Sequence, residues 1–181
     1  MALPTSGVIS AADINSIWSR STSTMSIYDA RNGVYGALND ASGLRPTAGS
    51  GSGYAWGDWY GYNHNAYYPF LTVYESEALA DTNIYISINN NYGTNYVSKW
   101  YFYGGTYDVA TDNGVTIREN DSVYAQWSFL GGWGDPNTNT LKRVYSTSRG
   151  FLYIGDGPTS TTVSYSFNIQ SGESVYVRGI N

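Results

Sequence analysis

The sequence predicts a mainly β protein, an antiparallel β-sandwich preceded by a small module of short helices and an aromatic loop. From about residue 70 onward, apolar and polar residues alternate in short runs, which is the period of half-buried strands. Turn-forming residues separate these runs at short intervals, as in sandwiches. Before residue 70, apolar residues recur at helical spacing instead. We therefore expect an amino-terminal docking module over residues 1–69 and a β-sandwich domain over 70–181.

Two short helices are expected where a serine is followed three residues later by an aspartate. These segments are 9–13 and 25–29, and a third, 54–58, has Ala55 in place of the serine. The hydroxyl of such a serine accepts a free backbone N–H, and the acidic group is favoured at a helix start. Apolar stripes follow the first two segments, at Ile14, Ile17 and Trp18 and at Tyr28, Arg31, Val34, Tyr35 and Leu38.

A stretch of Gly, Ser and Ala over 48–53 predicts a flexible connector. Five aromatic residues interleaved with glycines follow it, at Tyr54, Trp56, Trp59, Tyr60 and Tyr62. Large rings beside glycines indicate either tight packing against backbone or an exposed stacking surface.

The alternating runs that follow predict about seven to nine strands. The clearest are 84–88, 100–103, 123–129, 163–169 and 175–177. We assign five large residues of these runs to the core: Trp100, Trp127, Phe129, Phe167 and Val177. Segments 117–124 (IRENDSVY) and 169–176 (IQSGESVY) resemble each other at an offset of 52 positions. Each predicts a strand, an acidic turn and a second strand, so two similar hairpins are expected to face each other across one core.

The composition excludes several classes of function. A net charge of −5 disfavours nucleic-acid binding, which requires a basic face. No apolar run is long enough for a membrane span, and the first residues carry no signal-peptide pattern, so neither membrane insertion nor signal-directed secretion is expected. Without cysteine there are no disulfides, thiolate metal sites or cysteine nucleophiles. No cofactor and no metal are expected.

The opening LPTSGVISAADIN, the segment MSIYDA and the third segment ending in Asp58-Trp59-Tyr60-Gly61 resemble the amino-terminal module of many tailed-bacteriophage virion proteins. There, short Ile-Ser-x-x-Asp units precede a Phe/Tyr-Tyr-Gly stop. The later region is similar in style to immunoglobulin-like domains that decorate phage tails and capsids. The resemblance implies an immunoglobulin-like or jelly-roll-type sandwich and a structural role in the virion, and it identifies no catalytic residues. The implied location is the virion, with synthesis in the host cytoplasm.

Catalytic and metal-binding patterns are weak. The single histidine, His64, lacks the sequence context of a hydrolase triad or a metal site, and a polar loop position is favoured. The segment 135–139 places oxygen ligands at alternate positions, but it lacks the glycine and glutamate of an EF-hand, and a solvated turn is favoured. Carboxylate pairs occur among Glu75, Glu77 and Asp81 and at Glu119 and Asp121, as expected by chance. We expect no enzymatic activity.

Loop aromatics carry the functional prediction, because interface cores are rich in Tyr and Trp and poor in charge. The candidates for contact with other virion proteins or with further copies of the chain are Trp56, Trp59, Tyr60, Tyr62, Tyr67 and Tyr68. Trp133, in a glycine-rich loop, is the candidate for contact with a host-surface glycan. The rival functions are a carbohydrate- or receptor-binding module and a wall-degrading enzyme, which would need a pocket with convergent carboxylates.

Overall fold

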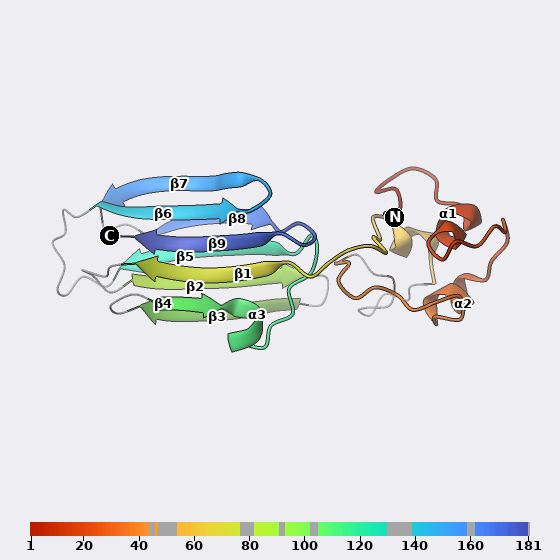
Figure 1. Cartoon of the computed structure of the whole chain (residues 1–181), viewed down its shortest axis with the longest axis horizontal. Helices are drawn as coiled ribbons and strands as arrows, with labels where there is room; N and C mark the ends of the chain where they lie inside the picture. Colours follow the sequence, from red (N-terminus) through yellow and green to blue (C-terminus); the bar gives the residue numbers. More distant parts are fainter. Residues whose placement is uncertain are drawn as a thin grey trace.

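The computed structural model describes residues 1–43, 46, 54–76, 82–90, 93–101, 105–129, 139–158 and 162–180. Within them, a module of short helices precedes two stacked β-sheets (Figure 1), which confirms the predicted fold class. The helical elements are α1 (Ala11–Ser16), α2 (Ile27–Arg31), the 3-10 helix η1 (Trp56–Trp59) and α3 (Val109–Asp112). The strands are β1 (Phe70–Ser76), β2 (Thr82–Asn90), β3 (Gly93–Tyr101), β4 (Gly105–Asp108), β5 (Ser122–Phe129), β6 (Asn139–Ser146), β7 (Gly150–Pro158), β8 (Val163–Asn168) and β9 (Ser174–Ile180).

The two sheets differ in how their strands pair. The five-stranded sheet has the order β4-β1-β9-β6-β7, and the four-stranded sheet has the order β3-β2-β5-β8. Among the strands described, all neighbours are antiparallel except β1 and β9, which run parallel with Phe70 opposite Ser174. In Figure 1 the five-stranded sheet lies in front of the four-stranded one. The parallel pair joins the first and last strands of the sandwich.

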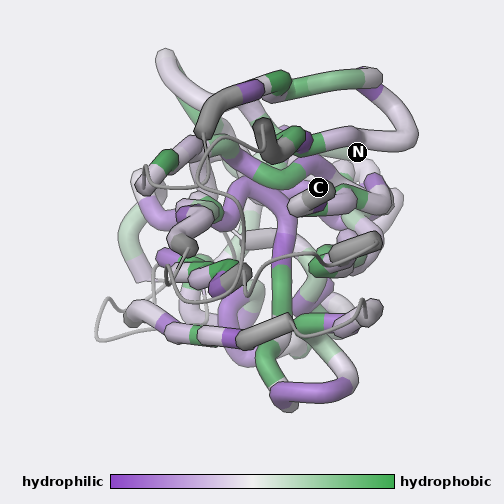
Figure 2. The backbone as a smooth tube through the Cα atoms, turned by 90° about the vertical axis from the view of Figure 1, so that its left-hand side faces the viewer, coloured by the Kyte–Doolittle hydropathy of each residue, from purple (hydrophilic) through white to green (hydrophobic). Residues whose placement is uncertain are grey.

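The main core lies between the sheets, where inward-facing residues of both meet. Trp127, Phe167 and Val177 are buried there, as predicted. Trp127 lies on the four-stranded sheet and donates its ring N–H to the backbone oxygen of Arg178 on the other sheet, at 2.9 Å. The side chains of Trp100 and Phe129 lie outside the part of the chain that is described. Figure 2 views the molecule from the end of the sandwich far from the amino-terminal module, with hydrophobic and hydrophilic residues both present along the chain.

A second hydrophobic cluster belongs to the amino-terminal module. Its buried members are Leu3, Ile9, Ile14, Ile17, Ala30, Trp59 and Tyr62. The predicted helix starts are confirmed. Ser10 accepts the N–H of Asp13 at 3.3 Å while its own N–H donates to that carboxylate at 2.8 Å, and Ser26 accepts the N–H of Asp29 at 3.2 Å. In the third segment the carboxylate of Asp58 accepts the N–H of Ala55, and the missing hydroxyl leaves the cap half formed.

The predicted stripe on the second helix is only partly correct. Tyr35 and Leu38 pack on the cluster of the module, but Tyr28 and Val34 are exposed. The reason is the length of α2, which ends at Arg31 and therefore cannot keep a helical face in phase beyond that residue. The connector predicted at 48–53 lies outside the described residues.

The two similar segments do not form hairpins, so that prediction is wrong. The strands β8 and β9 lie in different sheets, and the residues before β5 form no strand. The segments instead form the same turn at the start of β5 and of β9. In one, the N–H of Arg118 donates to the carboxylate of Asp121 at 2.8 Å, and in the other the N–H of Gln170 donates to Glu173 at 2.6 Å.

The backbone of these twin turns, 118–121 and 170–173, is equivalent as well. Asn120 has a φ of 67° and Gly172, at the same place in the second turn, has a φ of 66°. Asparagine and glycine are the residues that most readily adopt this left-handed conformation. The turns also touch, because Ile169 donates its N–H to the oxygen of Asp121 and accepts that of Asn120. The similarity between segments 117–124 and 169–176 therefore corresponds to a duplicated turn at one end of the sandwich.

Candidate functional site

An exposed group of aromatic side chains lies on the amino-terminal module, and we call it the module patch (Tyr28, Tyr54 and Trp56). The rings of Tyr28 and Tyr54 stack with centroids 5.4 Å apart and planes 10° apart. The guanidinium of Arg31 lies over the Tyr54 ring, 4.9 Å from its centroid. Tyr28 is 61% exposed and Trp56 is 43% exposed. The rings of Tyr28 and Tyr54 therefore remain open to solvent although they are stacked on each other, and Trp56 is exposed on the same module.

Three of the predicted contact residues lie inside or against the module core. Trp59 and Tyr62 are fully buried and meet edge to face at 5.8 Å. Tyr60 packs against the same cluster and donates its hydroxyl to the oxygen of Gly7. The chain start covers them, since the N–H of Leu3 donates to the oxygen of Tyr62 at 2.8 Å. Trp59 and Tyr62 therefore hold the module together and present no surface to a neighbour, and Tyr60 is half-buried against them.

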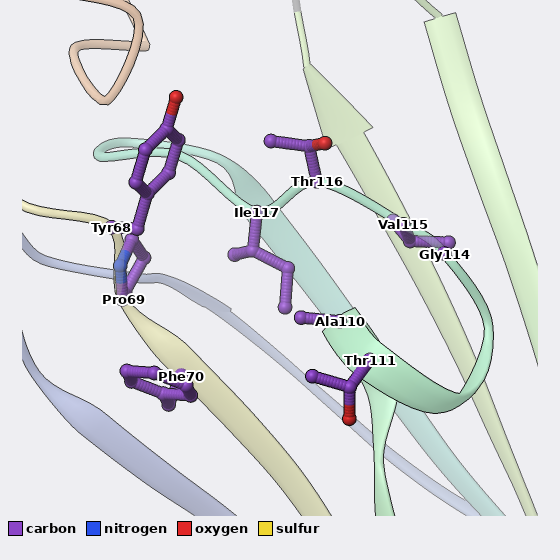
Figure 3. A pocket seen from close by; sticks show the side chains of 9 residues that line it. All are labelled: Tyr68, Pro69, Phe70, Ala110, Thr111, Gly114, Val115, Thr116 and Ile117. Carbon is purple, nitrogen blue, oxygen red and sulfur yellow. The ribbon is translucent and has the colours of Figure 1, made fainter.

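The other two predicted residues, Tyr67 and Tyr68, are exposed where the module joins the sandwich. Tyr68 borders an open groove of about 330 Å³. In Figure 3, Tyr68 and Phe70 lie on one side of this groove and Thr111 and Thr116 on the other. The groove is lined by Tyr68, Pro69, Phe70, Ala110, Thr111, Gly114, Val115, Thr116 and Ile117. None of the lining residues that the structure describes carries a carboxylate.

The module is seated on the twin turns. On the first turn, the N–H of Glu119 donates to the oxygen of Ala41 at 3.0 Å, and its carboxylate accepts the amide of Asn63 at 3.1 Å. On the second turn, Ser171 accepts the N–H of Tyr67 at 2.7 Å. Glu119 and Ser171 are equivalent positions of the two turns, at the offset of 52. The duplicated turn thus provides two matching attachment points for one module.

A close backbone contact reinforces the first attachment point. A Cβ built on Gly43 would lie 1.7 Å from the backbone oxygen of Glu119, so only glycine fits there. Beside it, the guanidinium of Arg118 donates to the oxygen of Asp40 at 3.0 Å.

His64 is a packed residue of the amino-terminal module. Its ring meets Trp18 edge to face, and its Nδ1 lies 3.0 Å from the Tyr62 hydroxyl. The same hydroxyl accepts the N–H of Asn39 at 2.7 Å. Burial, followed by the positive chain terminus, lowers the pKa of His64. The imidazole is therefore neutral at physiological pH.

Among the described residues, the buried acidic side chains are those of Asp121 and Glu173, and each accepts a backbone N–H of one twin turn. Burial raises the pKa of Asp121 to about 6 despite the opposing effects of the Arg118 N–H and charge. Burial alone would also raise the pKa of Glu173, but hydrogen bonds from Arg149, Ser146 and the backbone outweigh it and bring the pKa below its ordinary value. No group of three or more metal-ligating side chains occurs in the described part of the chain.

Several predicted sites cannot be placed. Trp133, the 135–139 segment, Glu77 and Asp81 lie outside the described residues, as does the side chain of Glu75. Glu119 and Asp121, the remaining carboxylate pair, bind the module and close the turn as described above.

Sequence reasoning missed one surface, the outer face of the four-stranded sheet. Its centre carries Tyr85, Tyr96 and Tyr124, and we call it the tyrosine face. The Tyr85 ring lies 5.9 Å from that of Tyr96 and 6.4 Å from that of Tyr124. A usable signal was present, because the positions that alternate with the apolar ones of 84–88 and 123–129 hold only Tyr, Ser and Gln.

Comparison of the chain with protein-family models, with curated proteins and with solved structures finds no match. None of the helices in the described ranges has the length and apolar character needed to cross a bilayer.

Proposed function

We propose that the protein is a structural component of a phage virion that acts through protein–protein contacts and has no enzymatic activity of its own. The amino-terminal module docks to another virion protein or to further copies of the chain. The β-sandwich then projects from the end of the module that does not dock. The residue patterns of the first sixty residues and the presence of the module patch support this proposal.

The module patch is the observation that carries it. Interfaces are enriched in Tyr, Trp and Arg and are depleted of Lys, Glu and Asp at their centres. Tyr28, Tyr54 and Trp56 with Arg31 have this composition on a module whose own core is small. Because two of the rings are already stacked, a partner would order few additional side chains, which lowers the entropic cost of binding.

Sedimentation velocity of the full chain tests the docking role. We expect concentration-dependent association that the Tyr54→Ala/Trp56→Ala double variant weakens at least about tenfold. The matched control is Val8→Ser, which removes another exposed apolar side chain of the module and should associate like the parent chain. Immunogold labelling of particles from cells that produce the chain tests the virion location. A chain that stays monomeric at millimolar concentration and labels no particle would contradict the proposal.

The second candidate function is a carbohydrate- or host-receptor-binding module on the virion surface. The tyrosine face favours it, because exposed aromatic rings surrounded by hydroxyl and amide groups suit a sugar better than a protein core. The two functions use different parts of the chain. The Tyr54→Ala/Trp56→Ala variant therefore tests docking, and variants of the tyrosine face test sugar binding.

A further inference from the structure

The tyrosine face carries no charge at the outward positions of β2, β3, β5 and β8 whose side chains the structure describes. These positions hold only Tyr, Ser, Thr, Asn and Gln. At its centre, Tyr85 lies opposite Ser98 on one side and Gln126 on the other. In the next register row, Ser87 lies between Tyr96 and Tyr124. The rings therefore stand on neighbouring strands in alternate rows, with small hydroxyl side chains between them.

The outer face of the five-stranded sheet is different. There the Arg178 guanidinium lies 5.2 Å from the ring centre of Tyr74, and Arg143 pairs with Asp156 at 2.8 Å. The same fold thus places charge on one outer face and leaves it off the other. The lack of charge on the tyrosine face is therefore a property of that surface and does not follow from the sandwich architecture.

This chemistry selects the occupant. A phosphate, sulfate or carboxylate group would find no cation on the tyrosine face, and the net charge of −5 repels polyanions. Tyrosine is also enriched at protein interfaces, so a protein partner is the alternative occupant that the sedimentation experiment below tests. A neutral sugar ring has one face of C–H groups, which stacks on an aromatic ring, and an edge of hydroxyls.

The hydrogen-bonding groups of the face suit those hydroxyls. Ser98 donates to the amide oxygen of Asn83 at 2.8 Å, and Thr94 donates to that of Asn89 at 2.6 Å. Both contacts fix the amide oxygen and leave the NH₂ group as a donor. Burial and the neighbouring hydroxyls of Tyr96 and Tyr124 raise the pKa of Tyr85, so its phenol stays protonated and can also donate.

We propose that the tyrosine face binds an uncharged polysaccharide, with the exposed ring of Tyr96 stacking on a sugar unit and the rings of Tyr85 and Tyr124 contacting the same chain. The site rests on the second candidate function above. The planes of Tyr85 and Tyr96 differ by 31°, so both rings can lie along one sugar chain, whereas the Tyr124 ring stands at 73° to Tyr85 and meets the chain with its edge. Because the face is an open sheet surface, it suits the side of an extended chain.

Affinity electrophoresis of the full chain tests the site. The native gels contain dextran, mannan or galactan as neutral polymers and alginate as the anionic one. At least one neutral polymer should retard the parent chain, and alginate should not. Tyr96→Ala and Tyr124→Ala should each weaken binding at least about tenfold, while Tyr96→Phe, which keeps the ring, should retain most of it.

Phe151→Ala is the matched control, because Phe151 is 60% exposed on the five-stranded sheet and Tyr96 is 64% exposed on the other. It should bind like the parent chain, and unchanged melting temperatures show that the variants fold. If no neutral polymer retards the parent chain, both the carbohydrate function and the site are wrong. Retardation that survives both alanine variants overturns the site alone. Dimers in sedimentation velocity that Tyr96→Ala dissociates would assign the face to a second copy and also overturn the proposal.

Discussion

Asp121 and Glu173 occupy equivalent positions in the twin turns, and each accepts the backbone N–H of the residue three positions before it. Both side chains are buried. They differ in their neighbours, since Glu173 pairs with Arg149 at 2.6 Å and also accepts the Ser146 hydroxyl. As a result the pKa of Asp121 is raised and that of Glu173 is lowered. The same turn geometry thus contains one buried carboxyl group with a raised pKa and one with a lowered pKa.

The raised pKa of Asp121 predicts that stability falls as the pH rises through about 6. The pKa changes from 3.8 in the unfolded chain to about 6 in the folded protein. Between these values the folded state binds more protons, so the stabilisation present below pH ~4 is lost above pH ~6, by up to about 3 kcal/mol. Asp121→Asn keeps the acceptor oxygen without the charge. Urea unfolding from pH 4 to 8 should show this fall in the parent chain and not in Asp121→Asn, and equal slopes would contradict the prediction.

Arg149 is expected to be the main support of the second turn. Arg149→Met leaves the Glu173 carboxylate buried without its cation and should cost about 3 kcal/mol at pH 7. Because the pKa of Glu173 is lowered, its stabilisation is present above its unfolded value and lost as the pH falls through the folded value. The cost of Arg149→Met should therefore shrink in acid. Glu173→Gln in the Arg149→Met background should restore part of the loss, and urea unfolding of the parent chain, the two single variants and the double variant measures the coupling.

Gly43→Ala should loosen the module from the sandwich. The new Cβ cannot fit beside the oxygen of Glu119, so the hydrogen bond from Glu119 to Ala41 should open. Amide hydrogen exchange at Glu119 should accelerate at least about tenfold, while exchange within β5 stays unchanged. Gly57→Ala is the control, because the nearest atom to its Cβ would be 3.9 Å away. Unaltered exchange at Glu119 would show that the contact is not needed.

Ala55→Ser should stabilise the module. The backbone of Ala55 is extended like that of Ser10, and Asp58 already accepts its N–H. A hydroxyl there would complete the cap, with an expected gain of about 0.5–1 kcal/mol. Thermal unfolding compares it with Ser10→Ala, which removes an existing cap and should cost about 1 kcal/mol. A destabilised Ala55→Ser variant would mean that the third segment does not follow the geometry of the first.

The local elements were predictable because their signals lie within a few residues. The Ser10 and Ser26 caps mark helix starts, and the alternation of 123–129 marks a strand whichever partner it has. The length of α2 was not predictable from its apolar spacing. It ends where Gly33 adopts a φ of 75°, a conformation that terminates helices.

Long-range placement could not be predicted in the same way. The similarity of 117–124 and 169–176 is visible in the sequence, but nothing local assigns β8 and β9 to different sheets. Trp59 and Tyr62 are buried because the chain start folds over them, a contact between residues about sixty positions apart. The tyrosine face could be located only once the structure showed which of the alternating residues point inward.

The paired seating of the module has a mechanical consequence. A single linker peptide transmits pulling force but offers little resistance to rotation. Here the twin turns hold the module at Ala41 and at Tyr67, on two strands that belong to opposite sheets. A sideways load on the far end of the sandwich is therefore opposed at two anchors instead of one, and we expect the module and the sandwich to rotate little against each other.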